Sequence, residues 1–228
     1  MVEVNIYNNI NVRNGKMFNK SREQLVNNLL KEGYIKTDKT KQAFLQVPRE
    51  IFLPSHLKTQ SYIDRPLEIG NGQTISAPHM VAIMCEALNV KIGHKILEIG
   101  SGSGYHAAIV SKLVGKKGKI YTIERYSNLA EQAINNLKDT SISNVIVEIG
   151  DGSQGLKKYQ PYDRIYVTCA APSIPEPLID QLKDYGKLLI PVGDMYCDLK
   201  LVEKKDNKIT TKGLGGCVFV PLVGKHGF

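Results

Sequence analysis

The sequence predicts an α/β fold with a doubly wound, mostly parallel sheet, an N-terminal helical extension and antiparallel C-terminal strands. Two observations carry this prediction. From Lys95 onward, apolar strand patterns alternate with helical patterns across short connections, which is typical of a parallel sheet covered by helices. At residues 95–104 (KILEIGSGSG), a strand pattern breaks into three glycines and resumes as a helical pattern at Tyr105. Such a turn brings bare backbone to a ligand at a helix N-terminus.

The first 20 residues are Asn-rich and weakly patterned, and we assign residues 1–20 to a separate N-terminal arm. Asn14-Gly15 is typical of a hairpin turn, and a loose tail is the alternative. Ser21 stands three residues before Gln24, the spacing of a capping box, which predicts a helix that begins there and ends at Gly33. The remaining residues, 21–228, form one predicted domain.

This domain has two predicted parts, a helical and substrate segment (21–92) and a core with C-terminal strands (93–228). In the first part we expect a helix capped by Thr37 or Asp38, a loop over 54–73 and a helix that starts at Pro78. The predicted core strands are 96–99, 120–123, 145–149, 164–168 and 188–192, and the helices between them lie near 105–114, 127–138 and 176–184. Two further strands, 199–203 and 217–221, are expected to pair around Asp206-Asn207.

Composition is that of an ordinary soluble globular protein, with 42% hydrophobic and 23% charged residues. No apolar run approaches the length of a membrane span, and the N-terminus lacks the basic-then-apolar layout of a secretion signal. The four cysteines are widely spaced, so we expect reduced thiols, no metal and a cytoplasmic protein. The net charge of +8 comes from scattered lysines, which does not favour a nucleic-acid partner.

Polar residues follow the ends of four successive predicted strands: Glu98, Glu124, Asp151-Gly152 and Thr168. Ligands of open α/β sheets bind beyond the carboxyl ends of the strands, so these residues are candidate cofactor ligands. Each acid taken singly also fits a helix cap, a turn or a solvated strand end. An acid directly before the glycines would repel a phosphate, but it suits the amine and sulfonium of S-adenosylmethionine.

The alternative cofactor is a dinucleotide. Residues 102–107 (GSGYHA) fit the relaxed G-x-G-x-x-A pattern, and Glu124 falls about 20 residues further on, where it fits a ribose diol in either case. Glu98 and Asp151-Gly152 discriminate between the two cofactors. A dinucleotide needs neither of them, and Glu98 would repel its pyrophosphate. This reading favours the core of a class I S-adenosylmethionine-dependent methyltransferase.

A second candidate site precedes the core. Residues 70–80 (GNGQTISAPHM) lead through glycines and hydroxyls into a helix N-terminus, whose free N–H groups and positive dipole can hold a carboxylate. The spacing alone favours Ser76 as the cap of that helix, and the two roles can coexist.

Residues 72–80 followed by 97–105 resemble the protein-L-isoaspartate (D-aspartate) O-methyltransferase family. The resemblance runs from about residue 21 to the C-terminus, and the first 16 residues depart from the family's pattern. The run 73–80 is highly specific, whereas the glycine motif is shared by many methyltransferases. Further matching runs are 121–125, 150–152, 161–163, 171–178, 189–193 and 219–222.

The resemblance implies a repair enzyme for damaged proteins and peptides. A methyl group would pass from S-adenosyl-L-methionine, leaving S-adenosyl-L-homocysteine, to the free α-carboxylate of L-isoaspartyl residues and to the β-carboxylate of D-aspartyl residues. The methyl ester would reclose to a succinimide that partly reopens to normal aspartate.

The resemblance also implies the roles of individual residues. It makes Ser76 the catalytic residue, and it places His79 in the same segment, where we expect a hydrogen-bonding residue rather than a general base. An ionised carboxylate needs no strong base. The implied substrate-binding residues are Thr74, Ile75, His79, Val220, Pro221 and Leu222. Together with the strand-end argument, the cofactor-binding residues are Glu98, Gly100, Ser101, Gly102, Gly104, Glu124, Asp151, Gly152 and Thr168.

Other function classes share parts of this pattern. An RNA methyltransferase fits the core and the basic charge, but residues 168–172 read TCAAP instead of the Asn/Asp-Pro-Pro-aromatic run of exocyclic-amine methylases. A ring-nitrogen methylase is left open by that test. A cofactor-binding module without catalysis and an NAD-dependent oxidoreductase are the remaining alternatives, which methyl-transfer and cofactor-binding measurements separate.

Overall fold

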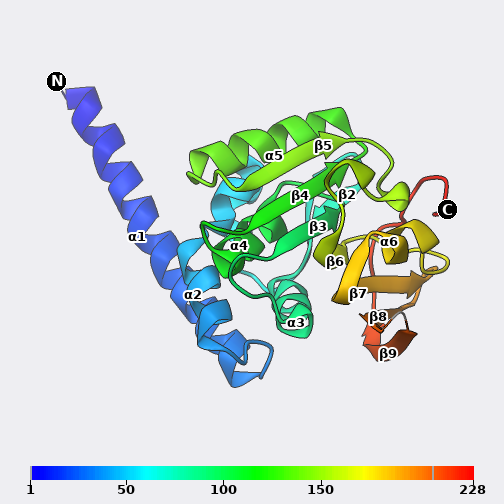
Figure 1. The fold of residues 1–228 in the computed structure, drawn as a ribbon. Coiled ribbons are helices and arrows are strands. Elements are labelled where there is room, and N and C mark those ends of the chain that lie inside the picture. The colour runs from blue at the N-terminus through cyan, green and yellow to red at the C-terminus, as the bar shows by residue number, and fades with distance from the viewer. Residues whose placement is uncertain (1, 207) are drawn as a thin grey trace.

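The structure, a computed structural model, describes the backbone of residues 2–206 and 208–228 and the side chains of these residues from Gly15 onward. A seven-stranded sheet lies at the centre in the order β5-β4-β3-β6-β7-β8-β9 (Figure 1). Its strands are β3 (Lys95–Ile99), β4 (Lys119–Glu124), β5 (Val145–Ile149), β6 (Tyr162–Val167), β7 (Leu182–Gly193), β8 (Cys197–Lys205) and β9 (Lys208–Cys217).

The sheet is doubly wound, as predicted. Strands β5, β4, β3, β6 and β7 are parallel, whereas β8 and β9 continue the sheet as antiparallel neighbours. The chain moves outward in one direction from β3 through β4 to β5, and in the other direction from β6 to β7. The strand order therefore reverses between β3 and β6, and their carboxyl ends mark the expected ligand site.

Helices cover both faces of the sheet, and the strand residues alternate between two apolar clusters. In β3, Ile96 packs in the cluster that contains residues of α1 to α5, while Leu97 and Ile99 pack with α6 in the other. This alternation follows from the two-residue period of a strand. The helices are α1 (Val2–Lys31), α2 (Asp38–Gln46), α3 (Pro78–Leu88), α4 (Tyr105–Val114), α5 (Ser127–Asp139) and α6 (Glu176–Asp180), with short 3₁₀ turns η1 (Arg49–Phe52), η2 (Ser55–Gln60), η3 (Gly152–Gln154) and η4 (Lys157–Tyr159).

The N-terminal prediction was wrong in its local structure. One continuous helix, α1, replaces both the hairpin turn at Asn14-Gly15 and the helix start at Ser21. No proline interrupts residues 2–31, and the last turns of α1 are held by the buried side chains of Leu25, Val26 and Leu29. The first part of the helix projects away from the rest of the molecule (Figure 1). The helix therefore continues beyond the part that is packed.

A short hairpin leads into the substrate segment, where the sequence predicted only a loop. Its strands are β1 (Leu67–Gly70) and β2 (Gln73–Ile75), and they pair antiparallel. The turn residues Asn71 and Gly72 have φ of 53° and 67°, which is typical of an Asn-Gly hairpin turn. This hairpin delivers residues 73–76 to the carboxyl ends of the core strands.

Two predicted elements near the C-terminus were misplaced. The helix predicted over 176–184 ends at Asp180, because β7 already begins at Leu182. The last strand is Lys208–Cys217 rather than 217–221, and its burial pattern is exposed throughout except at Cys217. Residues 218–221 leave the sheet, and Pro221 forms an isolated bridge with Ala170.

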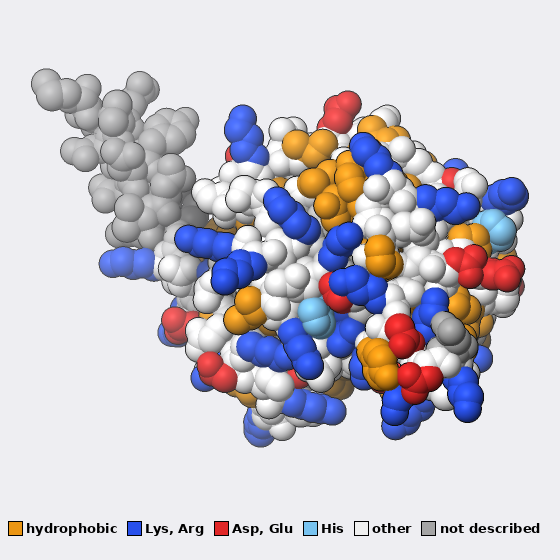
Figure 2. Space-filling view, viewed as in Figure 1, with side chains coloured by type: hydrophobic (Ala, Val, Ile, Leu, Met, Phe, Trp, Pro, Cys, Tyr) orange, Lys and Arg blue, Asp and Glu red, His pale blue; other side chains and the backbone are white. Residues whose placement is uncertain are grey.

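The surface carries many basic groups. On the face drawn in Figure 2, Lys and Arg side chains are spread among acidic and apolar ones rather than gathered in one patch. Within the described residues, no helix has both the length and the apolar character required to cross a membrane.

Candidate active site

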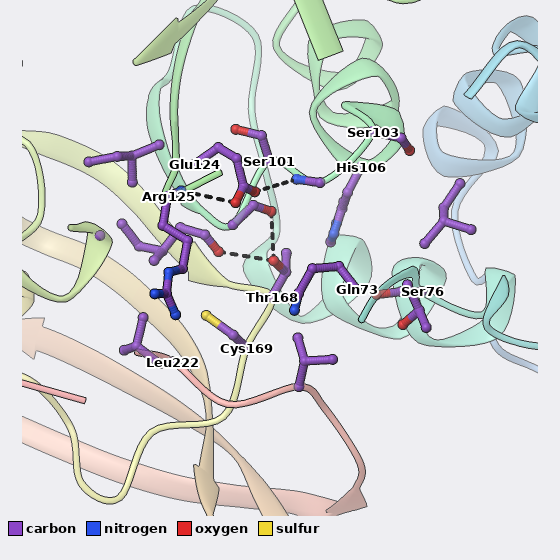
Figure 3. Close-up of a pocket in the computed structure, with 18 of the residues that line it drawn as sticks. Gln73, Ser76, Ser101, Ser103, His106, Glu124, Arg125, Thr168, Cys169 and Leu222 are labelled. Carbon is purple, nitrogen blue, oxygen red and sulfur yellow. Dashed lines mark hydrogen bonds between the residues drawn. The ribbon is translucent and has the colours of Figure 1, made fainter. Parts of the chain in front are cut away.

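A pocket lies beyond the carboxyl ends of β3, β4, β5 and β6, at the predicted switch point. In Figure 3, Thr168 occupies the middle of this pocket, with Glu124 and Ser101 on one side and Gln73 and Ser76 on the other. Most of the predicted residues line it. These are Thr74, Ile75, Ser76, Gly100, Ser101, Gly102, Glu124, Gly152, Thr168, Val220, Pro221 and Leu222.

The glycine loop after β3 requires glycine for steric reasons. Gly100 has a φ of +91°, and a Cβ at this position would clash with Thr168 Oγ1. The Thr168 hydroxyl donates to the carbonyl of Gly100 at 2.7 Å, which ties the loop to the end of β6. Gly104, which precedes α4 with a φ of +87°, does not line the pocket. The loop thus presents bare backbone to the cavity.

Glu124 holds the same loop from the other side. Its carboxylate accepts hydrogen bonds from the backbone N–H groups of Gly102 at 2.9 Å, Arg125 at 2.9 Å and Tyr126 at 3.1 Å. Each carboxylate oxygen has two lone pairs, so further donors such as a ribose diol can still be accepted. The side chain lies at the pocket wall, where the sequence placed it.

Glu98 lies behind the glycine loop and does not line the pocket. Its side chain is fully buried and accepts a hydrogen bond from Thr122 Oγ1, which in turn contacts Ser101 Oγ at 2.6 Å. Burial away from water raises the pKa of Glu98 to about 8. The acid that suggested a cationic cofactor therefore reaches the pocket only through Thr122 and Ser101.

Asp151 is also turned away from the cavity, although its neighbours Gly150 and Gly152 line the pocket. The carboxylate accepts hydrogen bonds from the backbone N–H of Ser153 at 2.9 Å, from Ser153 Oγ at 2.7 Å and from the backbone N–H of Lys225 at 2.9 Å. Partial burial pushes the pKa of Asp151 upward, but these hydrogen bonds outweigh burial and leave the pKa below its ordinary value.

Several pocket residues escaped the sequence analysis: Gln73, Ser103, Tyr105, His106, Arg125 and Cys169. His106 and Tyr105 sit in a helical apolar pattern, which resembles ordinary core. Burial lowers the pKa of His106 to about 3, so its ring is neutral. Among the described residues, His106 Nδ1 and Ser103 Oγ have no hydrogen-bond partner. Both atoms are buried within the protein.

A second pocket adjoins the first. It shares Thr74, Ser76, Thr168 and Val220 with the first pocket. Its remaining wall comes from the segment before β1, from the start of α3 with its cap, and from the end of β9 with the residues that follow: Pro66, Ala77, His79, Met80, Gly216, Cys217, Val218 and Phe219. The four shared residues form a common wall between the two cavities.

Ser76 does not cap α3, which corrects the favoured prediction. The cap position is occupied by Ala77, which makes no side-chain hydrogen bond, and Pro78 opens the helix. The side chain of Ser76 is half-buried and faces both pockets. Ser76 therefore belongs to the common wall of the two cavities.

His79 lies in the second pocket only. Its Nδ1 is 3.0 Å from Asp64 Oδ1, and its backbone N–H donates to the same oxygen at 2.9 Å. The ring also packs against Tyr34, with centroids 5.3 Å apart. These contacts agree with the expected hydrogen-bonding role.

The parallel sheet, the glycine loop and the acid at the end of β4 define the fold of a class I methyltransferase. The family model of protein-L-isoaspartate(D-aspartate) O-methyltransferase matches residues 19–227. The chain belongs to this family.

Individual relatives agree with the family match. A protein-L-isoaspartate O-methyltransferase from Methanopyrus kandleri is 51% identical over 216 residues, covering 93% of this chain and 96% of the relative. A solved protein-L-isoaspartate O-methyltransferase superposes with a TM-score of 0.83 at 33% identity, over 90% of this chain and 67% of that one. A Plasmodium falciparum structure of the family, in complex with S-adenosyl-L-homocysteine, has a TM-score of 0.80 at 30% identity, over 89% and 98% of the two chains.

Proposed function

We propose that this chain methylates the free α-carboxylate of L-isoaspartyl residues in damaged proteins, with S-adenosyl-L-methionine as donor and Ser76 as the residue that orients the carboxylate. The activity is that of the family to which the chain belongs. The observation that supports the assignment of Ser76 is the wall shared by the two pockets, which contains this side chain. A donor in one pocket and an acceptor in the other would meet there.

The first pocket fits the cofactor by the chemistry of its lining. When bound, S-adenosyl-L-methionine supplies an electrophilic methyl group on a positively charged sulfur. Glu124 offers a carboxylate for the ribose hydroxyls, and the glycine loop offers free backbone. The same lining contains a single side-chain cation, Arg125, which is few for a site that holds phosphates.

The second pocket suits an ionised carboxylate. A carboxylate has an unperturbed pKa of roughly 4, so it is already a nucleophile at neutral pH and needs no base. The chain must exclude water and direct one oxygen toward the methyl carbon. Ser76 can donate one hydrogen bond for this purpose without the full charge of a lysine, and the N-terminus of α3 adds a favourable dipole. Asp64, whose carboxylate lies 3.0 Å from His79 Nδ1, already engages this nitrogen of the His79 ring.

A matched peptide pair tests the reaction. Radiolabelled methyl transfer is measured to one peptide with L-isoaspartate and to the same peptide with normal L-aspartate. We expect a base-labile methyl ester on the isoaspartyl peptide alone. Absence of transfer to both peptides, with cofactor binding intact, would contradict the proposal. In that case tRNA is the next substrate to assay, because the RNA methyltransferases share the core.

The role of Ser76 is tested by Ser76→Ala, with the exposed Ser55→Ala as a matched control. Loss of one well-placed hydrogen-bond donor is expected to lower kcat on the order of 10²-fold, while the affinity for S-adenosyl-L-homocysteine changes less than about twofold. Turnover is measured with the isoaspartyl peptide and affinity by calorimetry. A Ser76→Ala variant with normal turnover, or one that no longer binds the cofactor product, would contradict this role.

The partners that we propose follow from the same chemistry. They are proteins and peptides that contain isoaspartate, in preference to nucleic acid or membranes. We place the activity in the cytoplasm because the spacing of the four cysteines favours reduced thiols.

A further inference from the structure

The last nine residues, Val220–Phe228, cross one side of the cofactor pocket, and we call them the C-terminal strap. At one end, the backbone N–H of Ala170, just after β6, donates to the carbonyl of Val220 at 2.8 Å, and the N–H of Leu222 returns to the carbonyl of Ala170 at 2.7 Å. Residues 220–223, the first part of the strap, line the pocket. The strap then reaches the loop after β5.

Two side chains of that loop hold the strap. Asp151 Oδ2 accepts the backbone N–H of Lys225 at 2.9 Å, and Ser153 Oγ accepts the backbone N–H of His226 at 3.0 Å. Ser153 Oγ also donates to Asp151 Oδ1 at 2.7 Å, so the two acceptors form one unit. A Cβ on Gly224 would overlap the Asp151 carboxylate. The strap therefore approaches the loop as closely as a bare backbone allows.

The end of the strap folds back on itself. The N–H of Phe228 donates to the carbonyl of Leu222 at 2.8 Å, and the N–H of Gly227 donates to the carbonyl of Gly224 at 3.0 Å. This turn encloses Leu222, which is 4% exposed and forms part of the pocket wall. The position of Leu222 is thus tied to the contacts that Lys225 and His226 make with the β5 loop.

We propose that Asp151 and Ser153 are positioning residues that latch the C-terminal strap over the cofactor pocket, and that this latch couples cofactor binding to the placement of the substrate wall. The inference rests on the proposed function in its choice of cofactor. Val220 lines both pockets, and Leu222 and Val223 line the first. A released strap would open the cofactor wall and displace Val220 together. Asp151 acts here through the strap, because its carboxylate does not line the pocket.

Two substitutions on opposite sides of the latch test the proposal. Asp151→Asn removes an acceptor but keeps the shape of the side chain, and Gly224→Ala pushes the strap off the loop without changing any pocket residue. We expect each to raise the dissociation constant of S-adenosyl-L-homocysteine roughly tenfold, which corresponds to one charge-assisted hydrogen bond. The dissociation constant of the double variant should exceed that of either single variant by no more than about twofold, because both substitutions break the same contact. Gly15→Ala, at a glycine of α1 with open space around it, is the matched control and should bind normally.

Amide hydrogen exchange gives a readout that does not depend on activity. The amide protons of Lys225 and His226 should exchange slowly in the original chain, and S-adenosyl-L-homocysteine should slow them further. Asp151→Asn should abolish this protection. In steady-state assays of the latch variants, KM for the isoaspartyl peptide should rise several-fold while kcat stays within about twofold.

Three outcomes would overturn the proposal. In the first, Asp151→Asn binds weakly while Gly224→Ala binds normally, which would show direct contact between Asp151 and the cofactor. In the second, both variants bind normally. In the third, Gly224→Ala does not fold and a chain that ends at Val223 folds and binds normally. Binding and exchange need no methyl transfer, so a failure of the repair reaction is distinguishable from a failure of the latch.

Discussion

Glu98 is a carboxyl group buried in the apolar layer between β3 and the helices that cover it. It shares that layer with Tyr166 and His106, whose rings lie 4.4 Å apart, and Tyr166 adds a negative neighbour only at very high pH because burial raises its pKa. Desolvation is the main cause that raises the pKa of Glu98 to about 8. The folded protein therefore keeps Glu98 protonated at neutral pH, when its hydroxyl can donate as well as accept.

This raised pKa predicts a pH-dependent loss of folding stability, which the substitution Glu98→Gln removes. Below pH 4.5, Glu98 is protonated in the folded and unfolded states and costs nothing. As pH rises toward 8, the unfolded state ionises while the folded state holds its proton, so the free energy of unfolding falls, by on the order of 5 kcal/mol at most. The free energy of unfolding of the two proteins is compared by urea titration at pH 5 and pH 8. We expect Glu98→Gln to gain relative to the original chain as pH rises.

The comparison isolates Glu98 because His106 titrates equally in both proteins. Burial lowers the pKa of His106 to about 3, so the contribution of His106 to the free energy of unfolding falls as pH drops below the ordinary pKa of histidine, 6.5. That contribution cancels in the difference between variant and original chain. A difference that is flat between pH 5 and pH 8 would show that Glu98 is ionised in the folded state.

Gly100 predicts a second effect at the scale of one residue. Gly100→Ala places a Cβ against Thr168 Oγ1 at a φ of +91°, so both backbone strain and a steric clash destabilise the fold. We expect a loss of roughly 2–5 kcal/mol in the free energy of unfolding. Gly93 has a φ of +84° with open space around it, so Gly93→Ala introduces backbone strain without a clash. This matched control is expected to lose about 1 kcal/mol in the free energy of unfolding. Equal losses in a urea titration would show that the contact with Thr168 does not matter.

Not every residue of the site is equally visible in the sequence. Glu124 and Thr168 end two parallel strands, so their meeting at one pocket follows from topology, and the structure places both in the lining. Glu98 and Asp151 satisfy the same rule but point elsewhere, because the side-chain direction depends on the pleat and on partners such as Lys225 that are distant in sequence. His106 was missed because a buried histidine in a helix has the pattern of core. Ser76 was assigned from the resemblance, since its spacing favoured a cap.

Elements are predictable where burial is periodic. The strands β3 to β6 were found within two residues at each end, and the apolar residues of β3, β4 and β6 divide between the two apolar clusters. The strand β9 was misplaced because nine of its ten residues are exposed, which leaves no apolar pattern. The segment 217–221 has such a pattern, but it leaves the sheet after Cys217, and its apolar residues line the two pockets. An apolar run near a ligand site can therefore be mistaken for a strand.

The helix α1 provides the prediction at the scale of one element. Among the described side chains, its first aromatic contact is between Phe18 and Tyr62, and Arg22 bonds the carboxylate of Glu50 at 3.2 Å and the hydroxyl of Tyr62 at 2.7 Å. A chain that begins at Met17 keeps these contacts. We expect its free energy of unfolding to stay within about 0.5 kcal/mol, with unchanged turnover.

A second truncation provides the contrast for α1. A chain that begins at Gln24 loses Arg22, which leaves the Glu50 carboxylate without its ion pair. Because both side chains are largely buried, we expect a loss of roughly 1–3 kcal/mol. Both chains are measured by thermal and urea unfolding. An inactive chain starting at Met17 would assign a function to the arm.

At the scale of the whole molecule, the pocket proposed for the cofactor is assembled from separate stretches of chain, which include residues 73–76 at the end of the β1–β2 hairpin. The loops after β3, β4, β5 and β6 converge because parallel strands end at one edge of the sheet, and the strap closes the remaining side. The parallel, doubly wound sheet is predictable from the alternation of strands and helices. The closure by residues 220–228 is not, because it depends on backbone hydrogen bonds that carry no sequence pattern.

A pocket built from so many stretches predicts that its ligand stabilises the entire fold. A ligand that binds only the folded state adds RT ln(1 + [L]/Kd), or about 2.7 kcal/mol at a concentration of 100 Kd. For a chain of 228 residues, this corresponds to an increase in Tm of roughly 5–10 °C. Thermal unfolding is measured with S-adenosyl-L-homocysteine and, in parallel, with NADH. We expect the increase with the first ligand alone, because Glu124 and the nearly uncharged lining suit a nucleoside better than a pyrophosphate. An equal increase with NADH would instead favour the dinucleotide reading of the glycine loop, since both ligands would then use the same backbone.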